Sequence, residues 1–73
     1  MNFKKINGIE VIDTDGYSVG KVDDLDVDMG KGLINYVIVK SGFSTRHIIN
    51  LDKIMSIGDK MILKIRKDEL GKK

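Results

Sequence analysis

The stretch of residues 13–28, DTDGYSVGKVDDLDVD, places the strongest limit on what this chain can fold into. A tight turn closed by Gly16 is followed by apolar residues that alternate with polar ones, which is the pattern of a half-buried strand. Val22 lies in one phase of this alternation. The next three apolar residues lie in the other phase: Leu25, Val27 and Met29. Because one straight strand cannot bury both sets, we infer a bulge or sharp bend near residues 23–24, the kind of corner that a small barrel needs.

The amino-acid composition favours β-structure. Eleven isoleucines and six valines stand against five leucines, and alanine, proline and tryptophan are absent. β-Branched side chains are stiff at their first torsion and suit a pleated sheet better than a helix, so we expect an all-β domain. The 73 residues contain no cysteine, so no disulfide can support this small domain. A well-filled aliphatic core, oligomerisation, or both must supply its stability.

Alternation and turn residues predict the order of the elements. We expect strands over residues 9–13, 18–28, 33–40, 46–51 and 61–65, and a short helical turn over residues 52–56. Gly16 closes the first hairpin, and Gly20 inside the second strand marks a bend or a close approach of another backbone. Gly58 and Asp59 form the turn before the last strand. We expect one domain over residues 1–73, with its core over residues 9–65 and a flexible basic tail over residues 66–73.

The run LINYVIVK, residues 33–40, is the most apolar part of the chain. By alternation, one of its faces carries Leu33, Val37 and Val39, and the other carries Ile34, Tyr36 and Ile38. The outer face of a barrel strand should be polar, so an apolar outer face implies a cover. That cover is either the tail of the chain or a second subunit.

Five residues are therefore candidates for a protein interface: Leu33, Val37, Val39, Tyr17 and Phe43. Tyrosine and phenylalanine are large, rigid anchors of the kind found at the centres of interfaces. The core is an equal alternative for them, because a small domain needs every large side chain that it has. A homodimer formed through the apolar strand face would reconcile the two interpretations.

Several short motifs together resemble the PRC-barrel family. They are the turn ending in Asp15-Gly16, residues 19–22 (VGKV), Asp24 at the bend, and residues 57–59 (IGD) before residues 61–63 (MIL). The resemblance covers residues 9–65 and implies a small, mostly antiparallel β-barrel of about six strands. Within the family, the chain is most similar to short stand-alone archaeal proteins, some of which are similar to cell-division adaptors that work with the membrane-anchoring protein SepF.

Two acidic groups and one histidine are candidates for chemistry. Asp24, Asp26 and Asp28 lie on one strand face, but Ca²⁺ requires about six to eight oxygen ligands, and a solvated strand edge explains them better. Residues 13–16 (DTDG) begin like a calcium loop but lack its later ligands, so we interpret them as a turn. His47 is the single histidine, and no cysteine or suitably placed serine makes it a catalytic base. We expect no catalytic residue, no metal and no cofactor.

Charge and hydropathy bear on two further classes of protein. The net charge is +2, and several basic residues near the two ends could form one patch: Lys4, Lys5, Lys64, Arg66, Lys67, Lys72 and Lys73. Two tyrosines and two phenylalanines make a poor platform for stacking bases, so we do not expect nucleic-acid binding, although the basic ends leave it open. No apolar run reaches the roughly 18 residues of a membrane span, so we expect a cytoplasmic protein without membrane insertion.

The sequence leads to two hypotheses about function. The first is a non-catalytic adaptor that self-associates and docks on protein partners, in an archaeal cell-division complex linked to SepF. Any membrane association would be indirect, through such a partner. The alternative is an RNA-binding or ribosome-associated maturation factor similar to RimM, another protein whose C-terminal domain is of the PRC-barrel type. RimM carries a further N-terminal domain that these 73 residues do not contain, which favours the adaptor.

Overall fold

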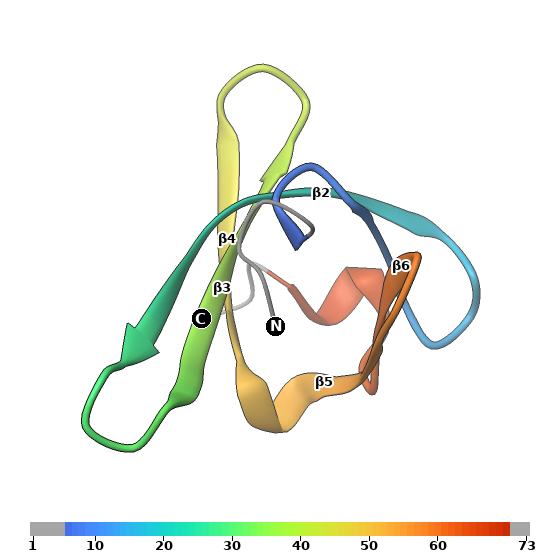
Figure 1. Cartoon of the computed structure of the whole chain (residues 1–73). Coiled ribbons are helices and arrows are strands. Elements are labelled where there is room, and N and C mark those ends of the chain that lie inside the picture. The colour runs from blue at the N-terminus through green and yellow to red at the C-terminus, as the bar shows by residue number, and fades with distance from the viewer. Residues whose placement is uncertain (1–5, 71–73) are drawn as a thin grey trace.

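Six strands form a single sheet in the computed structural model, which describes residues 6–70 (Figure 1). The strands are β1 (Glu10–Ile12), β2 (Ser18–Asp28), β3 (Leu33–Ser41), β4 (Thr45–Asn50), β5 (Ile54–Ile57) and β6 (Lys60–Leu63). Two short 3-10 helices complete the fold, η1 (Leu51–Lys53) and η2 (Lys67–Glu69). No helix among residues 6–70 has the length and apolar character to span a membrane. The all-β prediction is confirmed.

The order of the strands across the sheet is β4-β3-β2-β1-β6-β5. Neighbouring strands are antiparallel except β1 and β6, which pair in parallel with Val11 opposite Met61. The sheet curls into a barrel, but its two edge strands, β4 and β5, do not pair with each other, and η1 connects them along the chain. The predicted barrel of about six mostly antiparallel strands is therefore confirmed, with an open seam between β4 and β5.

β2 bends because its apolar residues do not keep a period of two. The register skips Val19 on the β1 side and Asp23 on the β3 side, so each is an extra residue without a partner. An extra residue turns the side chains that follow to the other face of the sheet, and Val22 and Leu25 thus both reach the core. Figure 1 shows the resulting strand curving around the barrel. The bend predicted near residues 23–24 coincides with the second bulge.

Gly20 lies where the β2 backbone passes close to β3. A Cβ atom at this position would collide with the carbonyl group of Lys40, so no larger residue fits unless the strands move apart. Gly58 and Asp59 connect β5 to β6, as predicted. A Cβ atom on Gly58 would meet no atom within 4 Å, so this turn does not require glycine.

β3 buries one of its faces in the core, which corrects the predicted interface. Val37 and Val39 are both 0% exposed, so they fill the barrel and cannot contact a second subunit. Leu33 does not share their face, because the register skips Asn35 and this bulge leaves Leu33 52% exposed. Strict alternation placed Leu33 on the same face as Val37 and Val39. The bulge at Asn35 could not be seen in the sequence, because the residues on both faces of this strand are largely apolar.

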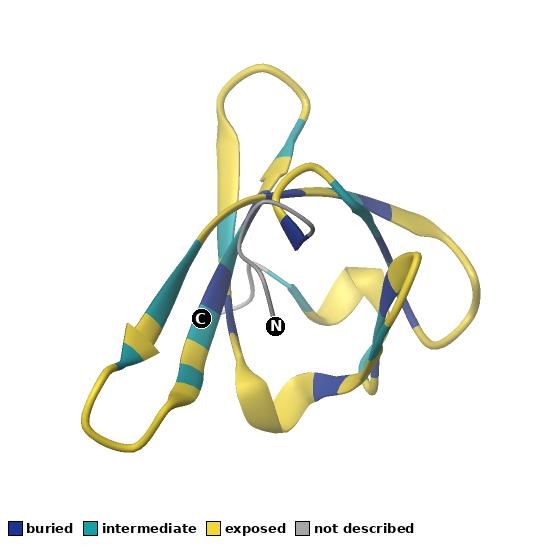
Figure 2. Ribbon diagram, in the orientation of Figure 1, coloured by how far each residue is buried: buried dark blue, intermediate teal, exposed yellow. Residues whose placement is uncertain are grey.

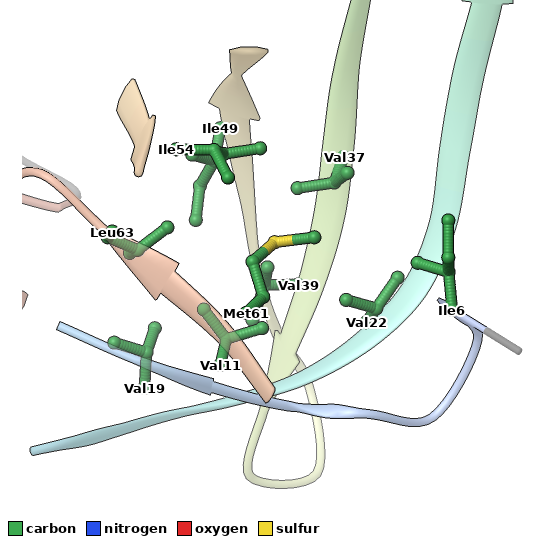
Figure 3. Packing of buried hydrophobic residues seen from close by; sticks show 10 residues of the cluster. All are labelled: Ile6, Val11, Val19, Val22, Val37, Val39, Ile49, Ile54, Met61 and Leu63. Carbon is green, nitrogen blue, oxygen red and sulfur yellow. The ribbon is translucent and has the colours of Figure 1, made fainter. Parts of the chain in front are cut away.

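Ten apolar residues fill the barrel, and they come from every strand and from the segment before β1 (Figure 3). They are Ile6, Val11, Val19, Val22, Val37, Val39, Ile49, Ile54, Met61 and Leu63. Met61, the one unbranched side chain among them, extends into the middle of the cluster in Figure 3. A flexible thioether adapts to the gaps that β-branched neighbours leave. Because Ile6 is buried, the core begins before the predicted start at residue 9.

Two predicted boundaries differ from the structure. The helical turn expected over residues 52–56 is confined to η1, and β5 begins at Ile54 because this residue is buried and pairs with Leu63 on β6. The flexible tail expected from residue 66 forms η2 instead, and Leu70 packs against the core. Residues 71–73 of that tail lie outside the described residues.

We expect Gly20→Ala to lower the free energy of unfolding by about 3 kcal/mol, because the added methyl group forces the β2 and β3 backbones apart. Gly58→Ala is the matched control and should change it by less than about 0.5 kcal/mol, since its methyl group meets open space. Urea denaturation followed by circular dichroism measures both values. Equal stability of the two variants would contradict the close approach of β2 to β3.

Candidate functional site

An apolar hollow of about 370 Å³ lies between the far end of the β2–β3 hairpin, η1 and β5. The residues around it have apolar side chains, apart from one glycine: Ile6, Leu25, Val27, Gly32, Leu33, Ile34, Leu51 and Ile57. Figure 1 shows the hairpin extending beyond the barrel on the side of β5. We call this site the apolar hollow.

The apolar hollow exists because the hairpin is longer than the strands that face it. β2 and β3 have 11 and 9 residues, whereas β5 and β6 have 4 each. The bulges at Asp23 and Asn35 turn Leu25, Val27 and Ile34 to the inner side of the hairpin. Among the described residues, no strand covers this part of the hairpin. Half-exposed apolar side chains around a concave surface are typical of a binding site.

A buried carboxylate ties the first hairpin to the segment after β6. Asp13 is 2% exposed, and one of its oxygens accepts hydrogen bonds from the backbone N–H groups of Asp15 (2.9 Å) and Tyr17 (2.8 Å). Its other oxygen accepts one from the backbone N–H of Lys67 (2.7 Å). The DTDG stretch is thus a turn, as predicted, and its first residue also fixes η2 to the barrel.

The environment of Asp13 keeps its carboxyl group ionised. Burial by itself raises the pKa of this group, but the hydrogen bonds from the backbone N–H groups of Lys67, Tyr17 and Asp15 outweigh burial and hold the pKa below its ordinary value. The negative charge is therefore balanced by oriented backbone dipoles. This arrangement stabilises the fold and engages both oxygens of the carboxylate in hydrogen bonds.

Tyr17 and Phe43, the two aromatic candidates for an interface, both lie on the surface. Tyr17 stands at the turn before β2, and Phe43 is fully exposed at the tip of the β3–β4 hairpin. The core interpretation is therefore wrong for both, and their role in an interface stays a prediction. Leu33 lines the apolar hollow at the opposite end of β3, so the structure does not bring Leu33 and Phe43 together.

The three candidate aspartates of β2, Asp24, Asp26 and Asp28, act locally on the outer face of the strand. Asp28 accepts hydrogen bonds from backbone N–H groups of the next turn, and Asp26 accepts one from the Asn35 side chain on β3 (2.9 Å). Asp24, beside the bulge, accepts one from the N–H of the following residue (2.8 Å). Within residues 6–70, no group of three or more His, Cys, Asp or Glu side chains is placed to hold a metal ion.

His47 and the basic residues considered as a patch form no chemical centre among the residues that the structure describes. His47 is half-buried on β4, opposite Val39. Arg66 lies close to the carboxylates of Asp68 (3.4 Å) and Glu69 (3.5 Å), which balance its charge locally. Four members of the patch lie outside the described residues: Lys4, Lys5, Lys72 and Lys73.

Neither the apolar hollow nor the hydrogen bond from Lys67 to Asp13 was predictable from the sequence pattern. The hollow depends on a bulge at Asn35 and on the difference in length between facing strands, neither of which alternation reveals. The Asp13 side chain did signal a turn, but its third partner, Lys67, is 54 residues away and offers a backbone N–H that almost any residue has.

Comparisons with known proteins agree with this fold. The model of the PRC-barrel domain family matches residues 1–70. Among solved structures, the chain is similar to one described as a 16S ribosomal RNA processing protein RimM from Pseudomonas aeruginosa, with a TM-score of 0.68 and 20% sequence identity. The match covers 93% of this chain and 45% of that chain, so the chain spans less than half the length of that protein. No curated protein matches the chain. At this identity, the structural likeness shows the fold alone.

We expect Asp13→Asn to lower the urea midpoint at pH 7, because an amide N–H₂ replaces one of the accepting oxygens. A carboxyl group whose pKa is lowered by folding stabilises the fold above its unfolded pKa, and that contribution is lost as the pH falls through the folded pKa. The difference between variant and wild type should therefore shrink below about pH 4. Urea titrations across this range measure the effect.

Asp15→Asn is the matched control for this prediction. The Asp15 side chain is exposed and accepts no hydrogen bond from the described residues, so we expect almost no change at pH 7. An Asp13→Asn variant as stable as the Asp15→Asn variant would contradict the structural role of the buried carboxylate.

Proposed function

The chain belongs to the PRC-barrel domain family, and we propose that it is a non-catalytic binding module that takes part in the maturation of ribosomal RNA. The observation that carries the binding role is the apolar hollow beside the β2–β3 hairpin. The ribosomal role is supported by the similarity to RimM, which is described as a 16S ribosomal RNA processing protein. The similarity favours this role over the adaptor that the sequence alone suggested.

The chemistry of the apolar hollow suits binding and not a reaction. None of its lining residues carries a titratable or nucleophilic side chain, whereas general acid–base and nucleophilic catalysis need such groups within reach of the substrate. Its volume of about 370 Å³ suits one or two large apolar side chains of a partner. Affinity would then come from burying apolar surface in a hollow that is already formed in the free protein, so that little ordering is needed on binding.

Self-association is a second candidate, and it would preserve the homodimer of the adaptor hypothesis. β4 is an edge of the sheet, and among the described residues its outer side pairs with no other strand. The free N–H and C=O groups of this edge are complementary to the same edge of a second copy running antiparallel. Ile48 on β4 is 67% exposed and would be covered in such a pair.

Other parts of the adaptor hypothesis have no support of this kind. No feature of residues 6–70 favours a cell-division role linked to SepF over the ribosomal role. A cytoplasmic location and an indirect association with a membrane through a partner remain predictions from the sequence.

The apolar hollow can be tested with Leu33→Lys, which places a charge at its rim. We expect the tagged wild-type chain to co-sediment with small ribosomal subunits or their precursors in extracts of its own host, and the variant to lose at least about tenfold of this binding. Sucrose-gradient sedimentation with immunoblotting measures both. Circular dichroism checks that the variant folds.

Met55→Lys is the matched control, because Met55 is also an exposed apolar residue but does not line the apolar hollow. It should sediment as the wild type does. Equal binding by both variants would exclude the hollow as the docking surface, and a wild-type chain that stays at the top of the gradient would exclude the ribosomal role.

Light scattering tests self-association through β4. We expect a wild-type dimer at micromolar concentration and a folded monomer for Ile48→Lys, because the introduced charges would repel each other across the two-fold axis. A wild-type monomer throughout this range would contradict the homodimer. A dimer that survives in Ile48→Lys would place the interface elsewhere.

A further inference from the structure

Three positively charged side chains lie next to one another across the sheet. Lys21 on β2 is opposite Lys40 on β3, and Lys40 is opposite Arg46 on β4. All three residues are exposed, and residues directly opposite in antiparallel strands share one face of the sheet. Because adjacent strands are about 4.8 Å apart, the three residues form a band about 10 Å wide. We call this band the cationic row.

The cationic row is only partly neutralised by its neighbours. Arg46 forms an ion pair with Asp23 (3.1 Å), whereas among the described residues neither lysine of the row has a carboxylate within 4.0 Å. Glu10 on β1 is opposite Lys21, but it forms its ion pair with Lys60 on β6 (3.1 Å). Like charges directly opposite in a sheet are destabilising. The facing pair Lys21 and Lys40 therefore destabilises the fold, and the attraction of Lys21 to Glu10 offsets only part of this repulsion.

An exposed aromatic ring and a second, smaller hollow adjoin the cationic row. Figure 2 shows that the tip of the β3–β4 hairpin is exposed. Phe43 lies at this tip, three residues after Lys40, or at most about 10 Å along the strand. The second hollow has a volume of about 290 Å³ and is lined by Lys21, Lys40, Gly20, Gly42, Ser18 and the carboxylate-bearing Glu10, which is paired with Lys60. Gly42 precedes Phe43, so this hollow reaches from the row to the tip of the hairpin.

We propose that the cationic row and Phe43 bind single-stranded RNA, with Lys21, Lys40 and Arg46 at the phosphates and Phe43 stacked on a base. A polyanion removes the repulsion within the row, and the counterions that it releases favour binding. An exposed ring gives a base a flat apolar surface on which to stack. This surface is distinct from the apolar hollow. The inference rests on the proposed ribosomal role in one respect: that role is the reason for choosing RNA as the polyanion.

An anionic membrane is the other polyanionic surface that a cationic row could meet. Insertion into lipid draws its strength from a continuous apolar surface. The tip of the hairpin offers a single apolar side chain, because the neighbours of Phe43 are Gly42 and Ser44. Single-stranded RNA uses one isolated ring together with a row of cations, so it fits this surface better.

Fluorescence anisotropy with a labelled oligouridine, begun at about 50 mM salt, tests the proposal. We expect Phe43→Ala to weaken binding about 5- to 100-fold with an unchanged salt dependence, because it removes stacking alone. We expect Lys40→Gln to reduce the slope of log K against log salt by about 0.7, because it removes one phosphate contact.

The chain offers matched controls at its other long hairpin. Met29→Ala removes an exposed apolar residue from the β2–β3 turn, and Lys31→Gln removes an exposed lysine from the same turn. Both variants should bind RNA as the wild type does. Because Lys40→Gln also relieves repulsion, it should unfold at a slightly higher urea concentration than the wild type, so weaker RNA binding cannot be attributed to unfolding.

Several outcomes would overturn the proposal. One is a wild-type chain that does not bind oligouridine at low salt, and another is binding that neither Phe43→Ala nor Lys40→Gln weakens. Sedimentation with phosphatidylserine vesicles in the absence of RNA binding would assign the surface to a membrane. Leu33→Lys should bind oligouridine normally, so a failure of ribosomal co-sedimentation and a failure of RNA binding can be told apart.

Discussion

The curvature of β2 is the constraint on which the rest of the structure depends. This strand pairs with β1 near its start and with β3 along most of its length, so it joins the two halves of the sheet. The extra residues Val19 and Asp23 let one strand direct side chains from both phases into one core. Gly20 allows the β2 and β3 backbones to approach where this bend begins. A straight β2 would leave a flat sheet that could not enclose Met61.

β4 and β5 do not pair, so they are joined only through η1 and through the core that Ile49 and Ile54 share, and further contacts hold the segments beside this seam. The Asp13 carboxylate fixes η2, and the backbone N–H of Lys64 donates to the carbonyl oxygen of Lys53 (2.7 Å), which joins the end of β6 to η1. Leu70 then packs against the core. A domain of this size has a stability of about 4–11 kcal/mol and no disulfide, so each of these contacts is a large share of the total.

The sequence predicted those features that a short stretch of residues shows by itself. The bend in β2 was predictable because apolar residues alternate with polar ones both before and after it. The switch of the apolar residues from the phase of Val22 to that of Leu25 and Val27 is therefore visible in the sequence. The bulge at Asn35 was not, because β3 is apolar in both phases there, and Val37 and Val39 were assigned to an interface as a result. The cationic row depends on the register of three strands, whereas the sequence suggested a possible basic patch only at the chain ends. Side-chain period alone does not fix register.

The two proposed binding surfaces lie at opposite ends of β3 and on opposite faces of the sheet. Ile34, near the start of β3, lines the apolar hollow on the inner face, and Lys40, near its end, belongs to the cationic row on the outer face. Six residues of extended strand separate them, or about 20 Å. Each surface costs stability in a small domain, one through exposed apolar area and the other through repulsion between like charges. Since the two proposed surfaces do not overlap, a protein bound in the hollow would leave the cationic row open to RNA, and β3 would set the distance between the two partners.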